Sequence, residues 1–527
     1  MESLPDEIRE KIYGKLSARD LLQALGVDHY TRSIIENSSV LMQKLPLFIT
    51  ETDEFSDHEK AIEPMMISRR KITKVIVELE REKIMKYLAI FKKFGGTIRI
   101  LEIKNYAFET VDQLRMILRF LPSLHSLKVT NVTFQEPENK FLNAIVQSPK
   151  SSLSQLRNFD SNNSDPKIFS LFAGNQDVQL STIRLQVNDS QTFSYGDFFK
   201  TMSQQTRLRH LRFDGITSEN SDIFDSDDLL QCQLDALVIK NCKIIIRDQM
   251  RNLIQLIRNQ KKLKILKILH TKISTSMDMM TTYRQIFSNC ITDVLLDIGD
   301  LSFFHSNQFT NRTVRSLTLH GNFAFENLPI FINFIKIFPN VVRLTLVGNQ
   351  PIGDKYLFQI LTTFKNLEEL LVPGFESRNG DSNFANLSSI ESKVNTLVLD
   401  YIDYNVKFFG WKNIVTNLSG IEKLVIKKDI GKVSNEILDM IVKKLKLQHL
   451  ELGIGVITEE ILRTIIWDNC CNQLKVLKIP KSDLKKIENK FDFKETFSRN
   501  QLLLYLCKDS YFHFNHEVIT KRSTRED

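Results

Sequence analysis

A short apolar pattern that recurs along most of the chain constrains its fold more than any other feature. Each copy reads apolar-x-x-apolar-x-apolar, and its second apolar position runs from Val75 to Leu477 in steps of about 27 residues. About sixteen copies are present, with two weaker ones around Phe159 and Ile183. One such copy cannot bury its own apolar face, so the pattern predicts stacked repeats that share a continuous core.

The spacing within a copy predicts the structure of each repeat. The apolar run is one strand whose alternate side chains enter the core, and strands of successive copies stack into a parallel sheet. Helical returns are expected between strands, over residues 81–94, 112–121, 248–259, 328–338 and 435–444. The fold class is therefore α/β, a solenoid with parallel strands on its concave side and helices outside. Tandem α/β domains would need longer strands and more variable crossovers.

The turn after each strand carries a second signal. Asn and Cys side chains hydrogen-bond the exposed backbone at this place in such repeats, and Cys242, Asn322 and Asn349 occupy it. Most copies lack this residue, so the repeats resemble degenerate leucine-rich repeats.

The first 45 residues follow a different, helical spacing. Apolar residues recur there in steps of three and four, which predicts short helices. Pro5 is placed just inside the first helix start, where its missing N–H costs nothing, and Asp6 and Glu7 add negative charge at the positive end of that helix. Ser17, three residues before Asp20, is an N-cap signal for the next helix. So small a unit buries little apolar surface, so a partner or the rest of the chain should cover part of it.

This opening stretch resembles an F-box, through Leu-Pro-Asp-Glu-Ile at 4–8, Ile12, Leu16-Ser17, Asp20-Leu21-Leu22, Val27 and the run 41–45. The resemblance implies docking on a Skp-type adaptor of a cullin–RING ubiquitin ligase, while the remainder of the chain binds the protein to be ubiquitinated. It also implies that the adaptor contact is made by Leu4, Pro5, Ile8, Ile12, Leu16, Leu21 and Leu22. The alternative is a helical cap that only covers the first repeat of a scaffold or ligand-sensing protein.

These patterns divide the chain into four parts. Residues 1–45 form the F-box-like helical domain, 46–71 a linker or joint, and 72–514 the solenoid. Residues 515–527 form a charged tail that is expected to be disordered.

Composition excludes several classes of protein. An apolar fraction of 42% with 25% charged residues is typical of a folded soluble protein, and no uncharged apolar run is long enough for a membrane span. The cysteines, Cys232, Cys242, Cys290, Cys470, Cys471 and Cys507, are too sparse for a disulfide framework and are interpreted as reduced, mostly buried thiols. We expect a cytoplasmic or nuclear protein without a membrane partner.

The sequence contains no recognisable catalytic or cofactor motif, so we expect a non-enzymatic protein without catalytic residues, cofactor or metal. His210 and His449 fall on the expected strand surface and are interpreted as ordinary surface residues. The vicinal pair Cys470-Cys471 is compatible with redox sensing, and buried core cysteine is the favoured interpretation.

The outward residue between the last two apolar positions of each strand indicates what the array binds. Basic residues dominate the first half and apolar residues the middle, which favours a protein-binding groove. The candidate target-binding residues are Lys128, Arg184, Arg212, Lys267, Leu295 and Leu371. Nucleic-acid binding through the basic repeats is a further alternative. It is disfavoured because 63 acidic residues are interspersed with 71 basic ones, for a net charge of +8.

Overall fold

The computed structural model describes residues 4–50, 65–68, 70–79, 84–135, 153–172, 177–187, 198, 201–202, 204–217, 232–244, 247–273, 287, 290–297, 309–321, 323, 328–348, 350–375, 391–403, 408–430, 440–441, 443–445, 447–454, 474–480, 503–507 and 516–518. The chain divides into two compact units. The first comprises Met1–Ile265 and His270–Asp278, and the second Leu266–Leu269 and Met279–Asp527. Each unit is described separately below.

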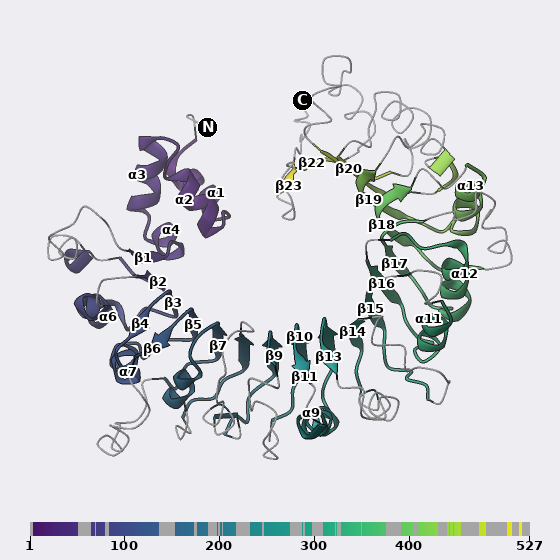
Figure 1. Cartoon of the computed structure of the whole chain (residues 1–527). Helices are drawn as coiled ribbons and strands as arrows, with labels where there is room; N and C mark the ends of the chain where they lie inside the picture. Colours follow the sequence, from purple (N-terminus) through teal and green to yellow (C-terminus); the bar gives the residue numbers. More distant parts are fainter. Residues whose placement is uncertain are drawn as a thin grey trace. The chain divides into compact units, whose positions relative to one another are not determined.

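The first unit opens with a small helical module (Figure 1). Its helices are α1 (Asp6–Tyr13), α2 (Ala18–Ala24), α3 (His29–Asn37) and α4 (Ser39–Lys44). Side-chain oxygens cap three of them, because Ser17, Asp28 and Ser38 accept backbone N–H groups at the starts of α2, α3 and α4. The expected cap at Ser17 is therefore confirmed, and Pro5 lies at the N-cap of α1, one residue before the expected position.

A parallel sheet follows the helical module in the first unit. Its strands pair in chain order and are β1 (Leu47–Thr50), β2 (Lys74–Glu78), β3 (Ile100–Lys104), β5 (Ser126–Thr130), β7 (Asn158–Asn162), β8 (Thr182–Gln186), β9 (His210–Asp214) and β10 (Ala236–Lys240). The register aligns the repeated apolar position, so that Val75 pairs with Leu101 and Leu101 with Leu127. These three side chains are fully buried, as the repeat pattern requires.

Helical segments of the first unit lie along one face of this sheet (Figure 1). They are η1 (Ile84–Tyr87), α6 (Leu88–Phe94), α7 (Val111–Arg119), η2 (Pro166–Leu171) and α9 (Arg247–Asn259). Short parallel pairs β4 (Ala107–Phe108) with β6 (Thr133–Phe134) and β11 (Lys243–Ile244) with β13 (Lys272–Ile273) complete the returns. Buried aromatic rings fill the layer between strands and returns, and Phe159 contacts Phe169 and Phe172 at centroid distances of 5.5 and 5.0 Å. We call the opposite sheet face, which carries the alternate strand residues, the open face.

The turns of the first unit explain the repeated asparagines. Asn105, Asn131 and Asn163 directly follow their strands and adopt left-handed φ values of 53, 52 and 49°, a conformation that asparagine tolerates better than most residues. Their side chains form a ladder, because Asn131 donates Nδ2 to Oδ1 of Asn105 at 2.8 Å and Asn163 donates to Asn131 at 2.9 Å. Gly215 takes this place after β9, where a Cβ would lie 1.9 Å from the carbonyl oxygen of Val187.

The residue after the left-handed position enters the core. Cys242 is buried, and its Sγ–H donates to the carbonyl oxygen of Lys240 at 3.1 Å, which confirms the turn role expected for this cysteine. Ser164 lies at the same place in its own repeat and accepts the N–H of Val132 at 3.0 Å. Asn322 and Asn349, the other two predicted turn residues, lie outside the described residues.

The second unit is built on the same plan (Figure 1). Its parallel strands are β14 (Asp293–Asp297), β15 (Ser316–His320), β16 (Arg343–Val347), β17 (Glu369–Val372), β18 (Thr396–Asp403), β19 (Lys423–Ile430), β20 (His449–Ile454), β21 (Val476–Pro480) and β22 (Leu503–Cys507). Its helices are α11 (Leu328–Ile335), α12 (Asp354–Thr363) and α13 (Phe408–Asn417). Strand β12 (Ile265–Leu269) lies where the chain divides.

The predicted α/β solenoid is confirmed, and the helices predicted over 112–121, 248–259 and 328–338 are found with small changes at their ends. Of the helix predicted over 81–94, residues 84–87 form the 3₁₀ helix η1, residues 88–94 form α6, and residues 81–83 lie outside the described residues. Most of 435–444 lies outside the described residues. None of the helices that the structure describes is long and apolar enough to cross a bilayer.

Two segments differ from expectation. The joint expected over 46–71 contains strand β1. This strand pairs in parallel with β2 and adds one more strand to the sheet before the first expected repeat. In the charged tail, His516–Val518 form β23, which pairs antiparallel with β22.

Candidate protein-binding surfaces

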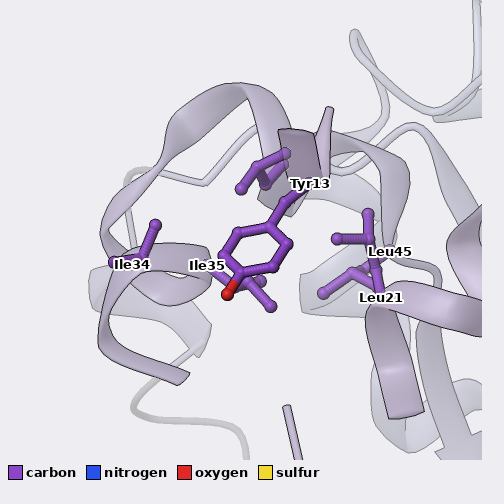
Figure 2. Packing of buried hydrophobic residues seen from close by; sticks show 6 residues of the cluster. Tyr13, Leu21, Ile34, Ile35 and Leu45 are labelled. Atoms are coloured by element: carbon purple, nitrogen blue, oxygen red, sulfur yellow. The ribbon is translucent and has the colours of Figure 1, made fainter. Parts of the chain in front are cut away.

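The helical module is held together by its own small core. Figure 2 shows the ring of Tyr13 among Leu21, Ile34, Ile35 and Leu45, all at most 9% exposed. These side chains come from α1, α2, α3 and the end of α4, so the core is shared by all four helices. Tyr13 also shares a 3.2 Å hydrogen bond with Thr31, so its hydroxyl is satisfied within the core.

A polar contact network joins the start of α1 to α3. Arg9, although only 5% exposed, lies 4.4 Å from the ring centroid of Tyr30 and donates Nε to the carbonyl oxygen of Leu4 at 2.8 Å. The hydroxyl of Tyr30 donates to Asp6, and this hydrogen bond raises the pKa of Tyr30. Asp28 accepts the backbone N–H of Thr31 at 2.6 Å, which lowers the pKa of Asp28. The α1–α3 arrangement is therefore fixed by polar contacts as well as by packing.

The predicted adaptor-binding residues fall into two groups. Ile8, Ile12 and Leu22 are 41, 39 and 41% exposed, and Ile8 and Ile12 share one face of α1 because they are four residues apart. Pro5 is also exposed, and Leu4 is half-buried.

The second group faces the module's own core. Leu16 is half-buried against the cluster, and Leu21 is fully buried within it. Leu21 is therefore part of the core, whereas Ile8 and Ile12 of α1 and Leu22 of α2 are exposed. We call these three exposed residues the α1–α2 surface.

The module is attached to the sheet through α4 and β1. Arg70, before β2, donates Nε and Nη2 to the carbonyl oxygen of Met42 at 3.2 and 2.9 Å, and Nη2 to that of Leu45 at 2.5 Å. Thr73 donates its hydroxyl to the carbonyl oxygen of Gln43 at 2.8 Å. The α1 face that carries Ile8 and Ile12 takes no part in these contacts.

On the open face of the first unit, three lysines surround one carboxylate. The Oε atoms of Glu102 lie 3.4 Å from Nζ of Lys74, 3.8 Å from Nζ of Lys104 and 3.4 Å from Nζ of Lys128. Burial alone would raise the pKa of Glu102, and the three ammonium groups outweigh burial, so this pKa lies below its usual value. Lys128 was predicted as a target-binding residue. Lys74 and Lys104 were missed because the prediction considered only the middle outward position of each strand.

The two predicted arginines of this unit pair with acids on the same face. Arg184 lies 4.0 Å from Asp160, and Arg212 donates Nη2 to Asp214 at 2.7 Å. Lys267, in the part of β12 that belongs to the second unit, is half-buried. The structure therefore brings Lys128, Arg184 and Arg212 onto one sheet face, where acids partly neutralise them.

The open face of the second unit carries an apolar and hydroxyl row. The register aligns Leu295 with Thr318, Thr345 and Leu371, and continues through Val398 to Val425. The predicted residues Leu295 and Leu371 are thus brought together in one row, and both are half-buried.

The charges beside this row are paired across strands. Arg343 forms a two-pronged contact with Glu369, donating Nε at 2.5 Å and Nη2 at 2.8 Å, and Lys427 lies 2.7 Å from Asp400. The hydrogen bond with Glu369 raises the pKa of Arg343, and the same contact lowers the pKa of Glu369. This row is therefore flanked by side chains whose charges cancel.

His449 belongs to a small charged group on β20 and β21. Its Nε2 lies 3.6 Å from Glu451, whose carboxylate is also 3.3 Å from Nζ of Lys478. Burial alone would raise the pKa of Glu451, and its contact with His449 and the charge of Lys478 outweigh that effect and lower it. His210, the other histidine singled out, is an exposed residue of β9.

The described cysteines match the interpretation as reduced thiols in part. Cys232 and Cys242 are buried and free, and burial raises the pKa of Cys232 to about 11 and that of Cys242 to about 12. Cys290 is free and exposed, which differs from the expected burial. Cys470 and Cys471 lie outside the described residues, so their interpretation as buried core cysteines stays a prediction, with redox sensing as the alternative.

No protein-family model matches the chain, and no curated protein sequence matches it. Among solved structures, the chain matches one from the crystal structure of the complex of Rad7 and Elc1 in yeast. The two chains are 13% identical, the match covers 95% of this chain and 92% of that one, and the TM-score is 0.27.

Proposed function

We propose that this protein is a non-catalytic substrate receptor of a cullin–RING ubiquitin ligase. The helical module docks on a Skp-type adaptor and through it on the cullin, and the repeats hold a target protein by their open faces. Catalysis is supplied by partners, since holding a target near a charged ubiquitin-conjugating enzyme raises the effective concentration of its lysines. The protein acts in the cytoplasm or nucleus without a cofactor.

One observation favours an adaptor-docking module over a helical cap that only covers the first repeat. A cap would bury its apolar side chains against the first strand, whereas Ile8, Ile12 and Leu22 stay about 40% exposed. The attachment to the sheet uses backbone carbonyls of 42–45 and strand β1 instead. The α1–α2 surface is left for another protein, as the F-box resemblance implies.

The experiment compares adaptor recovery by two surface variants of the full chain. Ile8→Ser with Ile12→Ser removes the apolar face of α1, and Val40→Ser is the matched control, since Val40 lies on α4 of the same module and is 58% exposed. We expect the double variant to recover at least about tenfold less adaptor and cullin, because apolar anchors carry most of an interface's free energy. The control should recover as much as the wild type.

Circular dichroism verifies that both variants keep their helices, which is expected because both replace exposed side chains. Equal recovery by the double variant and the wild type, or no adaptor recovered with either, would contradict the proposal.

A further inference from the structure

A mixed apolar and basic patch occupies the N-terminal end of the open face in the first unit. We define the β1–β5 patch as Phe48, Ile76, Lys74, Ile100, Lys104 and Lys128, with Glu102 at its centre. Register pairs Phe48 with Ile76, Ile76 with Glu102 and Glu102 with Lys128, so these residues follow one another across four neighbouring strands. The strands β1, β2, β3 and β5 lie side by side in Figure 1.

The apolar part of the patch presents side chains of uneven exposure. Phe48 is 48% exposed and Ile100 is 39% exposed, whereas Ile76 beside them is only 7% exposed. Ile100 pairs with Lys74, two residues before Ile76 on β2, which places it diagonally opposite Ile76 and within reach of a long side chain. A ligand side chain that packs against Phe48 and Ile100 would remove their exposed apolar surface from water. Ile76, which lies beside them, is already buried.

The basic part of the patch keeps donors for a ligand. The ammonium groups of Lys74 and Lys128 lie 3.4 Å and that of Lys104 3.8 Å from Glu102, and each ammonium group has three N–H donors, so donors remain beyond this contact. Their side chains are 35, 32 and 41% exposed, whereas that of Glu102 is 11% exposed. The patch therefore presents ammonium groups to solvent and withholds the carboxylate between them.

The charge balance of this patch is positive. Three lysines face two glutamates, Glu102 and Glu78, the latter 3.8 Å from Lys104. Asp160 pairs in register with Lys128 at the edge of the patch and lies 4.0 Å from Arg184. Elsewhere on the described open faces, Arg212 contacts Asp214 and Arg343 contacts Glu369.

We infer that the β1–β5 patch is a docking site for a segment of the target protein in which acidic residues flank an apolar side chain. The carboxylates bind the three lysines, and the apolar side chain packs on Phe48 and Ile100. This inference rests on the proposed function for calling the bound protein a ubiquitination target. It adds the chemistry of the bound segment. It also places that segment next to the helical module, because β1 begins three residues after α4 ends.

The test measures binding of labelled synthetic peptides to the purified full chain by fluorescence anisotropy. The probe peptide carries two phenylalanines flanked by glutamates. One comparison peptide replaces every glutamate by glutamine, and another replaces both phenylalanines by serine. We expect the probe to bind at least about tenfold more tightly than either, and its affinity to fall as salt is raised.

Chain variants assign this binding to the patch. Lys74→Gln with Lys128→Gln should weaken the probe about threefold for each lysine, in line with exposed ion pairs, and Phe48→Ser about tenfold. Lys92→Gln is the matched control, because Lys92 is an exposed lysine of α6, on the helical side of the same unit. It should bind like the wild type, and circular dichroism verifies that all variants are folded.

The outcomes separate this inference from the proposed function. Equal affinity for the glutamate and glutamine peptides, or an unchanged affinity in the lysine and Phe48 variants, would overturn the patch as a docking site even where the adaptor is recovered. Probe binding that is lost in these variants supports the patch, and it does so even if the Ile8 and Ile12 experiment shows no adaptor.

Discussion

Arg70 is expected to hold the helical module against the sheet, and replacing it by alanine should release the module. Its guanidinium donates three hydrogen bonds to the carbonyl oxygens of Met42 and Leu45, at 2.5 to 3.2 Å. A hydrogen bond from a charged donor contributes about 1.5–3 kcal/mol when buried, and water can replace part of it at this half-buried place. Arg70→Ala should therefore lower the free energy of opening the module by about 2–3 kcal/mol.

Native-state hydrogen exchange of the full chain measures this change. Backbone amides of α4 and β1 should exchange about 30- to 150-fold faster in Arg70→Ala, whereas amides of β5 and β7 should keep their rates. Arg70→Lys is the graded control. Its single ammonium group replaces the planar guanidinium, so it should restore part of the protection of the α4 and β1 amides against exchange. Adaptor recovery should stay within about twofold, since Ile8 and Ile12 lie outside this contact. Unchanged exchange in α4 and β1 would refute the reasoning.

Two further predictions concern the sheet of the first unit. Asn131→Ala should destabilise this unit by about 2 kcal/mol in urea unfolding, because it loses two exposed side-chain hydrogen bonds and places alanine at a φ of 52°. Asn131→Gly, which tolerates that φ, should cost about 1 kcal/mol less, and equal losses would argue against backbone strain. Glu102→Gln should destabilise the chain at neutral pH and progressively less as pH falls. The pKa of Glu102 is lowered in the folded state, so its contribution is present above the unfolded pKa of about 4.3 and is lost as pH falls through the folded value. A pH-independent difference between the two proteins would contradict this assignment.

The repeat architecture was predictable because it depends on spacing alone. Each apolar-x-x-apolar-x-apolar run became a strand, including the weak copies around Phe159 and Ile183, since a fully buried position needs only an apolar side chain of suitable size. Strand β1 was missed because it contributes a single short run of apolar residues, Leu47 to Ile49, without the full pattern. Its assignment depends on pairing with β2, which is tertiary information.

The candidate surfaces were predictable only in part. Helical spacing marks which residues of 1–45 are apolar, but not which of them the module buries itself, so Ile8 and Leu21 looked equivalent in sequence. The lysines around Glu102 come from three strands, and cross-strand register had to be known before Lys74 and Lys128 were seen to share one carboxylate. A scan of all alternate strand positions, rather than the middle one alone, would have found them.

The charge arrangement on the open face also weighs against nucleic acid as the ligand of the repeats. A strand-binding track needs cations that are free to replace counterions along the phosphates, with aromatic side chains between them for stacking. On the open face of the first unit, the two predicted arginines contact acids on the same face. Arg184 lies 4.0 Å from Asp160, and Arg212 lies 2.7 Å from Asp214. A phosphate would have to displace these carboxylates or lie beside them, and either costs electrostatic free energy. Among the described residues, the lysines around Glu102 form a cluster of three cations on neighbouring strands, over a length that suits a short acidic segment of a protein.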